Sequence, residues 1–432
     1  MGAARLFGQN TVSVVHAVST SVNKQALQMN SGESGRTLPQ ADWTQREDLA
    51  ALVAALGTEN VRWVGGAVRD TLLGLPVKDV DAATLHRPEE VMARLEAAGI
   101  HAIPTGIDHG TVTAILPGGN VEVTTLRRDV STDGRRATVA FASDWPEDAA
   151  RRDFTINALY AHPDTLEIED HFGGLEDLTA HRVRFIGDAR ERIREDHLRI
   201  LRYYRFQARF GGELDKEAEE ACAELAATLK GLSRERVAME LLNLLSLPDP
   251  YATVARMESR GVLPVVLPEV GARGVAALQG LIAEEMRQRV APDPLRRLAA
   301  LLPPDPYLAE AVAARLRLSA AQRKRLVTAA DRAGGGPGDA RALAYRLGRE
   351  QAIDRLLLAG ADTAPLSGWD IPQFPLKGGE IVARGVSAGP EVARILRAVE
   401  QRWIADGFPE PARVETLLAD ELAEGRGQDS QA

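Results

Sequence analysis

The 432-residue sequence predicts an α+β protein, in which a head with a mixed sheet and helices precedes an all-α region. Two observations support this prediction. From residue 61 to about residue 185, short runs of β-branched residues alternate with helical stretches. From about residue 186 onward the pattern is nearly all helical and is interrupted mainly by Gly and Pro. At roughly 150 residues per domain, this length accommodates about three domains.

Local signals mark the elements of the expected head. Asp42 is expected to cap the first helix, and Pro88 suits the first turn of another. The sequence Pro-Gly-Gly-Asn at 117–120 predicts a hairpin turn. The polar stretch 126–150 has no clear periodicity and is expected to be a functional or mobile loop. The expected elements are a helix over 42–57, a strand over 61–64, a helix over 65–73, a strand over 77–84, a helix over 88–99, and strands over 111–116 and 121–125.

Cysteine and histidine usage limits the chemistry. The single cysteine, Cys222, excludes an intramolecular disulfide and a cysteine-cluster metal site. It suits a reducing cytosol, so a cytoplasmic location is expected. All eight His lie at or before His197, which excludes a His-ligated metal site from the last 235 residues. No apolar run approaches the roughly 18–20 residues that cross a bilayer, so no membrane association is expected.

A glycine pair, Gly65 and Gly66, stands between an expected strand and an expected helix. Glycine lets a backbone approach a ligand closely, and a helix N-terminus offers free N–H groups to an anion. Taken alone, a glycine pair is usually just a turn.

Three acidic residues follow on expected strands: Asp79, Asp81 and Glu122. Alternation along a strand places the carboxylates of Asp79 and Asp81 on one face and Val80 on the other. Two carboxylates so close repel each other unless a cation joins them, and oxygen-preferring divalent cations such as Mg²⁺ fit this arrangement. A neighbouring strand could bring Glu122 beside the pair. Taken alone, an Asp-x-Asp is more often a solvated turn, and a strand Glu is commonly just exposed.

Two arginine-rich segments complete the set of candidate residues. In Arg151-Arg152-Asp153, two guanidinium groups can grip a triphosphate while the acid orients them; the alternative is a surface ion pair at a helix start. Glu195, Asp196 and Arg199 are expected on one continuous helix with the arginines that follow. By spacing alone, such a helix is more often a surface helix with many salt bridges.

The order of these motifs resembles the class II tRNA nucleotidyltransferase (CCA-adding enzyme) and bacterial poly(A) polymerase family. The matching segments are Gly-Gly-x-Val-Arg-Asp at 65–70, Asp-x-Asp at 79–81, Val-Glu-Val at 121–123, Arg-Arg-Asp-Phe-Thr-x-Asn-Ala at 151–158 and Asp-His-Phe-Gly-Gly-Leu-Glu-Asp-Leu at 170–178. The resemblance implies a polymerase-β-type nucleotidyltransferase head followed by a helical neck, body and tail. The expected division is a disordered extension over 1–41, a catalytic head over 42–185, a neck over 186–248 and a body and tail over 249–432.

The resemblance also implies roles for residues. Asp79 and Asp81 would hold two Mg²⁺ ions and would be catalytic together with Glu122. Base selection would fall to Glu195, Asp196 and Arg199. The residues implied in nucleotide binding are Gly65, Gly66, Arg69, Arg151, Arg152, Asp153, Asn157, Asp196, Arg199, Arg202 and Arg205.

The base-selecting segment has a clear chemical logic. Cytosine and adenine each present an exocyclic amino donor beside a ring-nitrogen acceptor, and uracil and guanine reverse that order. An Asp acceptor fixed next to an Arg donor therefore suits C and A and rejects U and G. Asp196 and Arg199 match the Glu-Asp-x-x-Arg motif of the family. By resemblance, this motif takes the place of a nucleic-acid template.

The implied function is addition or repair of the 3′-terminal CCA of tRNA from CTP and ATP, with release of pyrophosphate and no protein partner implied. The segment at 104–112 resembles the CCA-adding type rather than a poly(A) polymerase, and the loop containing Asp133-Gly134-Arg135-Arg136 has the length expected of full CCA addition. A poly(A) polymerase, a CC-adding or A-adding enzyme, and an inactive tRNA-binding protein stay open as alternatives.

The net charge of −9, from 61 acidic and 52 basic residues, argues at first against a nucleic-acid partner. The positive charge is, however, local. Residues 182–210 hold nine Arg against four acids, and residues 286–325 hold nine Lys and Arg against three acids. The first stretch lies at the expected nucleotide site, and the second lies in the expected body, where an RNA could bind.

Overall fold

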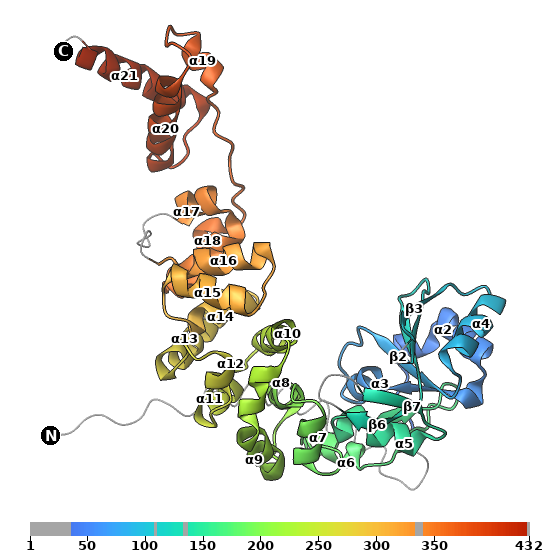
Figure 1. Cartoon of the computed structure of the whole chain (residues 1–432). Coiled ribbons are helices and arrows are strands. Elements are labelled where there is room, and N and C mark those ends of the chain that lie inside the picture. The colour runs from blue at the N-terminus through green and yellow to red at the C-terminus, as the bar shows by residue number, and fades with distance from the viewer. Residues whose placement is uncertain (1–35, 108–109, 133–136, 333–339, 430–432) are drawn as a thin grey trace, which may run out of the picture. The chain divides into compact units, whose positions relative to one another are not determined.

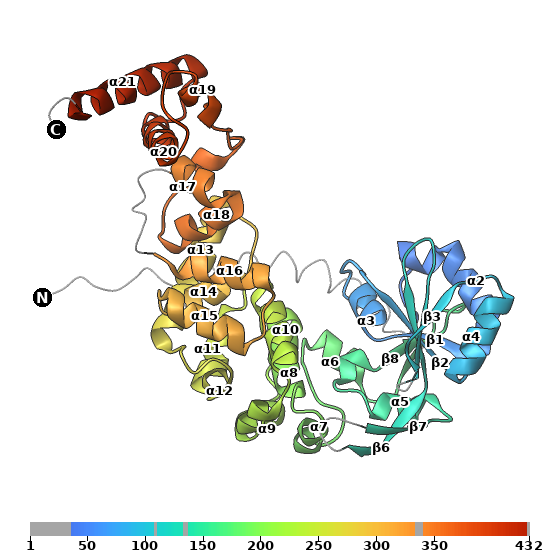
Figure 2. The same cartoon turned by 45° about the horizontal axis from the view of Figure 1, so that its top comes forward.

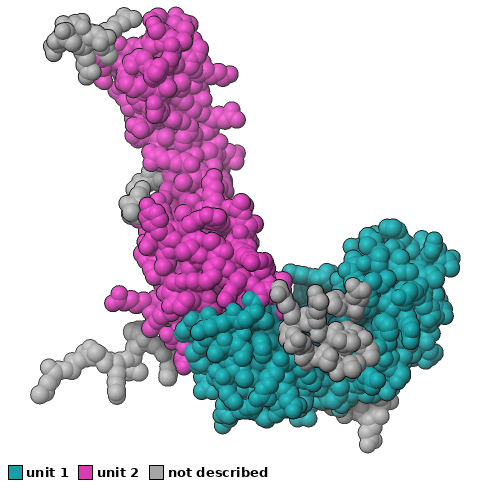
Figure 3. Space-filling model, in the orientation of Figure 1, with its two compact units in different colours: residues 1–232, 260–265 teal, residues 233–259, 266–432 magenta. Residues whose placement is uncertain are grey.

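The computed structural model describes residues 36–107, 110–132, 137–332 and 340–429. The chain forms two compact units: one comprises residues up to 232 with 260–265, and the other comprises 233–259 with 266–432 (Figure 3). Most of the expected extension and the loop residues 133–136 lie outside the described residues, as do residues 108 and 109 of the segment at 104–112. The division into head, neck, body and tail stays a prediction.

The head contains a mixed seven-stranded sheet in the order β3-β4-β5-β2-β1-β8-β9 (Figures 1 and 2). Strands β2 and β5 pair in parallel, and the other neighbouring pairs in this sheet are antiparallel. This confirms the predicted fold class. The strands are β1 (Val61–Val64), β2 (Val80–Thr84), β3 (Ala102–Gly106), β4 (Thr111–Ala114), β5 (Val121–Thr125), β8 (Leu159–Ala161) and β9 (Ile168–Asp170).

Helices cover the sheet on both sides. Helices α2 (Glu47–Leu56) and α4 (Pro88–Ala97) lie together on one side of the strands, and α3 (Gly66–Leu72) lies on the other (Figure 2). Pro88 occupies the first turn of α4, as predicted, because its missing N–H is not needed there. Asp42 does not cap α2: it opens a short 3-10 helix, Asp42–Gln45, that precedes it.

The expected strand over 77–84 is shorter than predicted, because β2 begins at Val80. Its neighbours explain the start: Val80 pairs with Val121, the first residue of β5, and Asp81 pairs with Val64, the last residue of β1. In the described part of the chain, no strand therefore lies beside the residues before Val80. Asp79 precedes the strand and is exposed.

The stretch 126–150, predicted to be a loop, forms the hairpin strands β6 (Arg127–Thr132) and β7 (Ala137–Phe141) and helix α5 (Trp145–Ala150). The hairpin is a two-stranded sheet of its own, so its strands need not show the apolar alternation of a half-buried strand. Strand β3 was also missed. It lies largely exposed at the sheet edge, where Pro104 is tolerated.

After β9, every named element among the described residues is helical. The first unit continues with α6 (Gly174–Thr179), α7 (Ala189–Glu195), α8 (Arg199–Phe210) and α9 (Lys216–Glu224). The prediction of one continuous helix through Glu195 and Arg199 is wrong. Asp196 has an extended backbone, with φ of −146° and ψ of 103°, and ends α7. Its carboxylate accepts a hydrogen bond from the N–H of Leu198 at 3.1 Å, which leads the chain into α8.

The described end of the expected extension packs onto the head. The Leu38 N–H donates to the carbonyl of Leu166 at 2.7 Å, and the Ile168 N–H donates to the carbonyl of Arg36 at 2.7 Å. The Leu38 side chain is buried. Residues 36–38 therefore line the edge of the sheet next to β9.

In the second unit, every element assigned to the described residues is a helix. Ser233 caps α10, as its side chain accepts a hydrogen bond from the N–H of Arg236. Near the C-terminus, an apolar cluster surrounds the buried Trp403. The helices that follow the first unit's α9 are α10 (Arg234–Leu245), α11 (Tyr251–Ser259), α12 (Leu263–Val266), α13 (Ala272–Gln288), α14 (Pro294–Leu301), α15 (Pro306–Arg315), α16 (Ala320–Ala330), α17 (Ala340–Leu347), α18 (Arg349–Leu358), α19 (Gly378–Val382), α20 (Pro390–Ala405) and α21 (Pro411–Asp429).

None of the helices in the described part of the chain combines the length and the apolar character that crossing a membrane requires.

Candidate active site

Two carboxylates lie side by side on the parallel strands β2 and β5. Asp81 is in register with Glu122, and Asp81 is also in register with Val64 on β1. Residues in register on neighbouring strands point to the same face of a sheet, so both carboxylates share one face. Asp81 is partly buried and Glu122 is exposed. The sheet therefore joins two of the three predicted acids, and Asp79 lies two residues before Asp81 in the chain.

The charges of the other two acids affect the pKa of the Asp81 carboxyl. Burial raises the pKa of Asp81 most, and the charges of Glu122 and Asp79 raise it further, while the charge of Arg152 opposes them; the resulting pKa is about 6. Such mutual repulsion is what a bound cation relieves. The chemistry of the donor set, oxygen only and close to a cationic side chain, fits a hard divalent ion. Within the described residues, no three His, Cys, Asp or Glu side chains already converge closely enough to hold a metal ion.

Gly65 links the end of β1 to the start of α3. Its φ of +71° lies in the left-handed region that favours glycine. A Cβ built there would lie 3.7 Å from Nη1 of Arg152 and 3.9 Å from the carbonyl oxygen of Asn157. Gly65 therefore lies directly beside Arg152, one of the two arginines predicted to bind phosphate, and a Cβ on Gly66 would lie 3.7 Å from Nη2 of Arg69.

The arginine pair follows the C-terminus of α5, rather than a helix start. Arg151 and Arg152 both donate to the buried carboxylate of Asp148, from Nε of Arg151 at 2.8 Å and from Nη2 of Arg152 at 3.1 Å. The hydroxyl of Tyr160 donates to Asp148 at 2.6 Å and accepts from Nε of Arg152 at 3.0 Å. Burial alone would raise the pKa of Asp148, but the charges of Arg152 and Arg151 and the Tyr160 hydrogen bond outweigh it and lower the pKa to about 2.

A second network joins α3 to α8. The buried guanidinium of Arg69 donates to Asp70 at 2.8 Å and to the side-chain oxygen of Asn157 at 2.5 Å. The amide of Asn157 donates to Asp153 at 3.0 Å, and Arg202 on α8 donates to the other oxygen of Asp153 at 2.7 Å and 2.5 Å. Burial disfavours the Asp153 charge, but the charge of Arg202 and the Asn157 hydrogen bond lower its pKa. Four predicted nucleotide-binding residues thus contact one another.

The segment predicted to select the base lies where α7 meets α8. Nη1 of Arg199 donates to Glu195 at 2.5 Å and to the carbonyl of Arg192 at 2.8 Å, and its Nη2 donates to the carbonyl of Arg151 at 3.1 Å. The guanidinium of Arg205 lies over the ring of Phe206, 4.4 Å from its centroid. The segment therefore contacts the arginine pair through the backbone carbonyl of Arg151.

The structure thus places all the predicted residues in one compact unit. Their roles stay predictions. Three further residues were missed: Asp148, Tyr160 and Arg192. The i, i+3 and i+4 spacing of Asp148 from the two arginines on a helical turn was the available signal for the first. No local signal pointed to Tyr160, because it lies on β8 and its partners Asp148 and Arg152 lie on and just after α5.

The basic stretch 286–325, predicted to offer a surface for RNA, is partly internal to the second unit. Arg296 and Arg297 on α14 are buried and both donate to Glu285, at 2.8 Å and 2.9 Å. Arg325 is held by Asp354 at 2.6 Å. These arginines neutralise buried acids, because a buried carboxylate needs a partner, and their charge is not available to a phosphate backbone.

Two family models match the chain. The Poly A polymerase head domain matches residues 61–184, and the model described as the probable RNA and SrmB-binding site of polymerase A matches residues 212–273. The first match spans the sheet and both carboxylates, and the second begins after α8.

Curated relatives match over most of the chain. The mitochondrial CCA tRNA nucleotidyltransferase 1 of Mus musculus is 35% identical over 391 residues, which cover 84% of this chain and 87% of the relative. The human counterpart, from Homo sapiens, is 34% identical over 392 residues with the same shares. The CCA-adding enzyme of Geobacillus stearothermophilus is 40% identical over 231 residues, which are 53% of each chain.

Solved structures of CCA-adding enzymes also align with most of the chain. The crystal structure of the Bacillus stearothermophilus CCA-adding enzyme in complex with CTP aligns with a TM-score of 0.70 and 26% identity, over 89% of this chain and 99% of that chain. The Thermotoga maritima CCA-adding enzyme complexed with tRNA-CCA aligns with a TM-score of 0.65 and 20% identity, over 93% of this chain and 98% of that chain. At 20% identity, the second likeness shows the fold alone.

Proposed function

We propose a function for this chain, which belongs to the CCA tRNA nucleotidyltransferase family. It adds or repairs the 3′-terminal CCA of tRNA, using CTP and ATP, releasing pyrophosphate and needing no nucleic-acid template. The observation that carries this proposal is the register of Asp81 and Glu122 on parallel strands beside the arginine pair. That arrangement suits transfer of a nucleotidyl group and is not needed for RNA binding alone.

The carboxylates of Asp79 and Asp81 are proposed to hold two Mg²⁺ ions, with Glu122 completing the acidic face. When bound, such ions stabilise charge on the attacking 3′-hydroxyl oxygen and on the leaving pyrophosphate. The position of Arg152 supports this placement. Its charge acts on Asp81, so its guanidinium is close enough to contact the phosphate oxygens of a nucleotide bound beside the acids.

The triphosphate is proposed to bind between the glycine pair and the arginine pair. Gly65 and Gly66 leave room for close approach of phosphate to the backbone, and Arg152 lies within 3.7 Å of a Cβ position on Gly65. Arg151 and Arg152 are held by Asp148, so their guanidinium groups are oriented before a nucleotide binds. Arg69, Asp153, Asn157 and Arg202 support the site through their own network.

Base selection is proposed to rest on Asp196 and Arg199. An Asp acceptor takes the exocyclic amino group of cytosine or adenine, and an Arg donor reaches the adjacent ring nitrogen. Glu195 orients Arg199, as the 2.5 Å contact between them supports, and Arg205 supports the base or phosphates from the next turn of α8.

One assay tests the proposal. The purified chain is incubated with Mg²⁺, labelled CTP and ATP, and a tRNA that lacks its terminal CCA. Ordered addition of C, C and A is expected. Addition of an A tract indicates a poly(A) polymerase, addition of C, C or A alone indicates a partial enzyme, and no addition indicates an RNA-binding protein; each of these outcomes contradicts the proposal.

The compartment is proposed to be the cytoplasm, since a single buried cysteine suits a reducing environment. Two of the relatives above are mitochondrial proteins. Cell fractionation with antibody detection distinguishes the two locations.

A further inference from the structure

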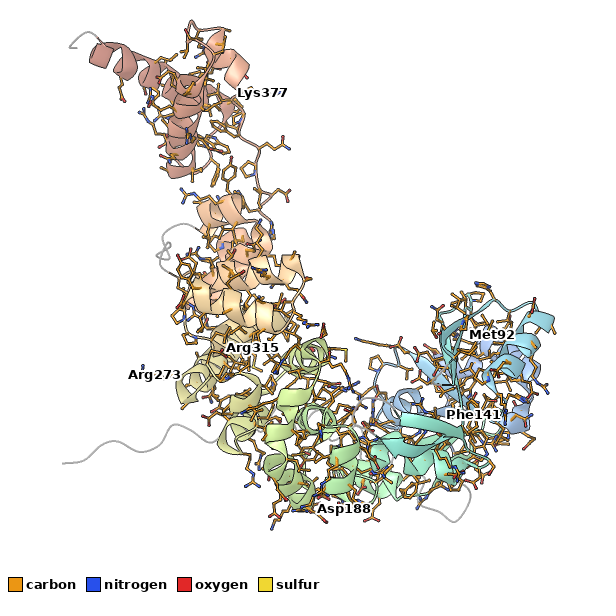
Figure 4. The ribbon with its side chains drawn as sticks, viewed as in Figure 1. Met92, Phe141, Asp188, Arg273, Arg315 and Lys377 are labelled. Carbon is orange, nitrogen blue, oxygen red and sulfur yellow. The ribbon has the colours of Figure 1, made fainter. Side chains whose placement is uncertain are left out.

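A closed ring of contacts includes Arg199, the arginine proposed to select the base. Its least expected member is Arg192 on α7. Helix α7 begins after Asp188, which Figure 4 labels and whose carboxylate caps it. One end of the Arg192 guanidinium, Nη1, donates to the carbonyl of Ala150 at 3.0 Å. The other, Nη2, forms an ion pair with Oε1 of Glu195.

The ring closes through Arg199. Oε2 of Glu195 accepts from Arg199 at 2.5 Å, and Arg199 donates in turn to the carbonyl groups of Arg192 and Arg151. The two oxygens of one carboxylate therefore hold two arginines, and the two arginines hold consecutive carbonyls of the segment that leads to Arg152. Three chain segments meet in this ring: α7, the start of α8 and the end of α5.

The contacts of Arg199 leave a defined edge for a ligand. A guanidinium has five N–H donors. Nη1 uses two of them on Glu195 and the Arg192 carbonyl, and Nη2 uses one on the Arg151 carbonyl. Among the described residues, Nε and one Nη2 hydrogen of Arg199 meet no protein acceptor. These two donors are the part of Arg199 that can contact a base.

We propose that Arg192 is a specificity-determining positioning residue: it fixes Glu195 and the Ala150 carbonyl so that Arg199 presents only this free edge to the incoming base. Arg192 does not touch the nucleotide. Without it, Glu195 can pair with Arg199 in more than one geometry, and the Ala150–Arg151 backbone loses one of its two guanidinium anchors. The free edge of Arg199 then no longer has a single direction. This inference rests on the proposed function, since it concerns selection of CTP and ATP.

The measurement is the ratio of kcat/KM for CTP over UTP, and for ATP over GTP, in single-nucleotide addition to tRNA. In Arg192→Gln, each ratio is expected to fall about tenfold, the effect of losing one charge-assisted contact. Arg190→Gln is the matched control. Arg190 lies on the same helix and pairs with Glu224 on α9 at 2.8 Å, outside the ring, so its ratios stay unchanged.

A conservative variant and a double variant separate positioning from a structural role. Lysine keeps the charge but lacks the fork that reaches both Glu195 and Ala150, so Arg192→Lys is expected to fall between the wild type and Arg192→Gln. If Arg192 acts through Arg199, adding Arg192→Gln to Arg199→Ala leaves the ratios of the single Arg199→Ala variant unchanged.

Several results overturn the inference. Unchanged ratios in Arg192→Gln do so, as do ratios that fall equally in Arg190→Gln. If the Arg192→Gln protein does not fold, the Arg192→Lys variant is measured instead. Wild-type kcat/KM ratios in Arg192→Lys then contradict the inference. Affinities for CTP and UTP, measured by calorimetry without tRNA, keep this question apart from the proposed function. A wild type that prefers CTP but adds nothing to tRNA contradicts the proposed function alone.

Discussion

Asp81 and Glu122 face each other across the parallel pairing of β2 and β5, and the pKa of Asp81 rises to about 6. Burial is the main cause, and the charge of Glu122 is the next. The protein therefore carries a repulsive pair of carboxylates at the point where the proposed reaction needs cations. A site that binds cations tightly is expected to be under strain without them.

Asp81→Asn is expected to abolish nucleotide addition, because it removes a proposed metal ligand. The same change should stabilise the metal-free protein at pH 7.5 by about 1–3 kcal/mol, since a shift of two pKa units corresponds to roughly 3 kcal/mol. Urea unfolding in EDTA measures the free energy of unfolding. A less stable variant would contradict the repulsion, and normal turnover would contradict the ligand role.

The pH dependence of this effect has a definite sign. A carboxyl whose folded pKa is raised destabilises the fold as the pH rises from about 4 to about 6, and the full cost is present above pH 6. The stability gain of Asp81→Asn should therefore vanish below pH 4.

Asp148 behaves in the opposite way. Its pKa of about 2 stabilises the fold above pH 4, and this contribution is lost as the pH falls toward 2.

Arg199→Ala is expected to keep the fold but to relax or abolish selection of CTP and ATP over UTP and GTP. The reason is that the Asp196 acceptor alone cannot reject a base whose donor and acceptor are reversed. Incorporation of each labelled nucleotide into tRNA measures selection, and circular dichroism checks the fold. Unchanged preference would remove the base-selecting assignment.

Tyr160→Phe removes a single hydroxyl that contacts both Asp148 and Arg152. The KM for CTP and for ATP should rise by the same factor, several-fold, because the change loosens the phosphate side and not the base side. The free energy of unfolding should fall by about 1–2 kcal/mol. A KM that rises for one nucleotide only would place Tyr160 in base selection instead.

Arg297→Met tests the buried ion network of the second unit. Arg297 is fully buried, donates to Glu285 at 2.9 Å and also donates to the carbonyl of Leu245 at 2.8 Å. Removing one partner of a buried pair costs about 3–5 kcal/mol. Arg317→Met is the control: its pair with Glu235 is exposed, so the cost should stay below about 1 kcal/mol. Thermal or urea unfolding compares the two variants, and equal costs would contradict the argument.

The sequence predicted the fold and the site best where residues with a chemical role also follow the local pattern of a strand or helix. The motif order predicted the mixed head and the helical remainder, and alternation around Glu122 placed its carboxylate outside the apolar face. The predicted start of the strand over 77–84 was wrong, because neighbouring strands decide where that strand begins. Strand β2 begins only where β5 and β1 pair with it, so Asp79 lies outside the strand. Registers of this kind depend on residues distant in the chain and leave no local pattern.

Local spacing also could not separate ligand-facing arginines from structural ones. Arg296 and Arg297 belong to a basic stretch and are buried against Glu285, whereas Arg190 is only partly buried. The break between α7 and α8 was hidden for a related reason. Every residue from 189 to 210 tolerates a helix, and the extended backbone of Asp196 follows from its contact with the N–H of Leu198.

The parallel pairing of β2 and β5 has a consequence for how the head assembles. A parallel pair needs a crossover, and here the chain passes through α4, β3 and β4 before Val121 reaches Val80. The acidic face therefore forms only after contacts between residues some forty positions apart are in place, which slows folding relative to local hairpins. The acidic face therefore cannot be complete before synthesis of the chain has passed Thr125.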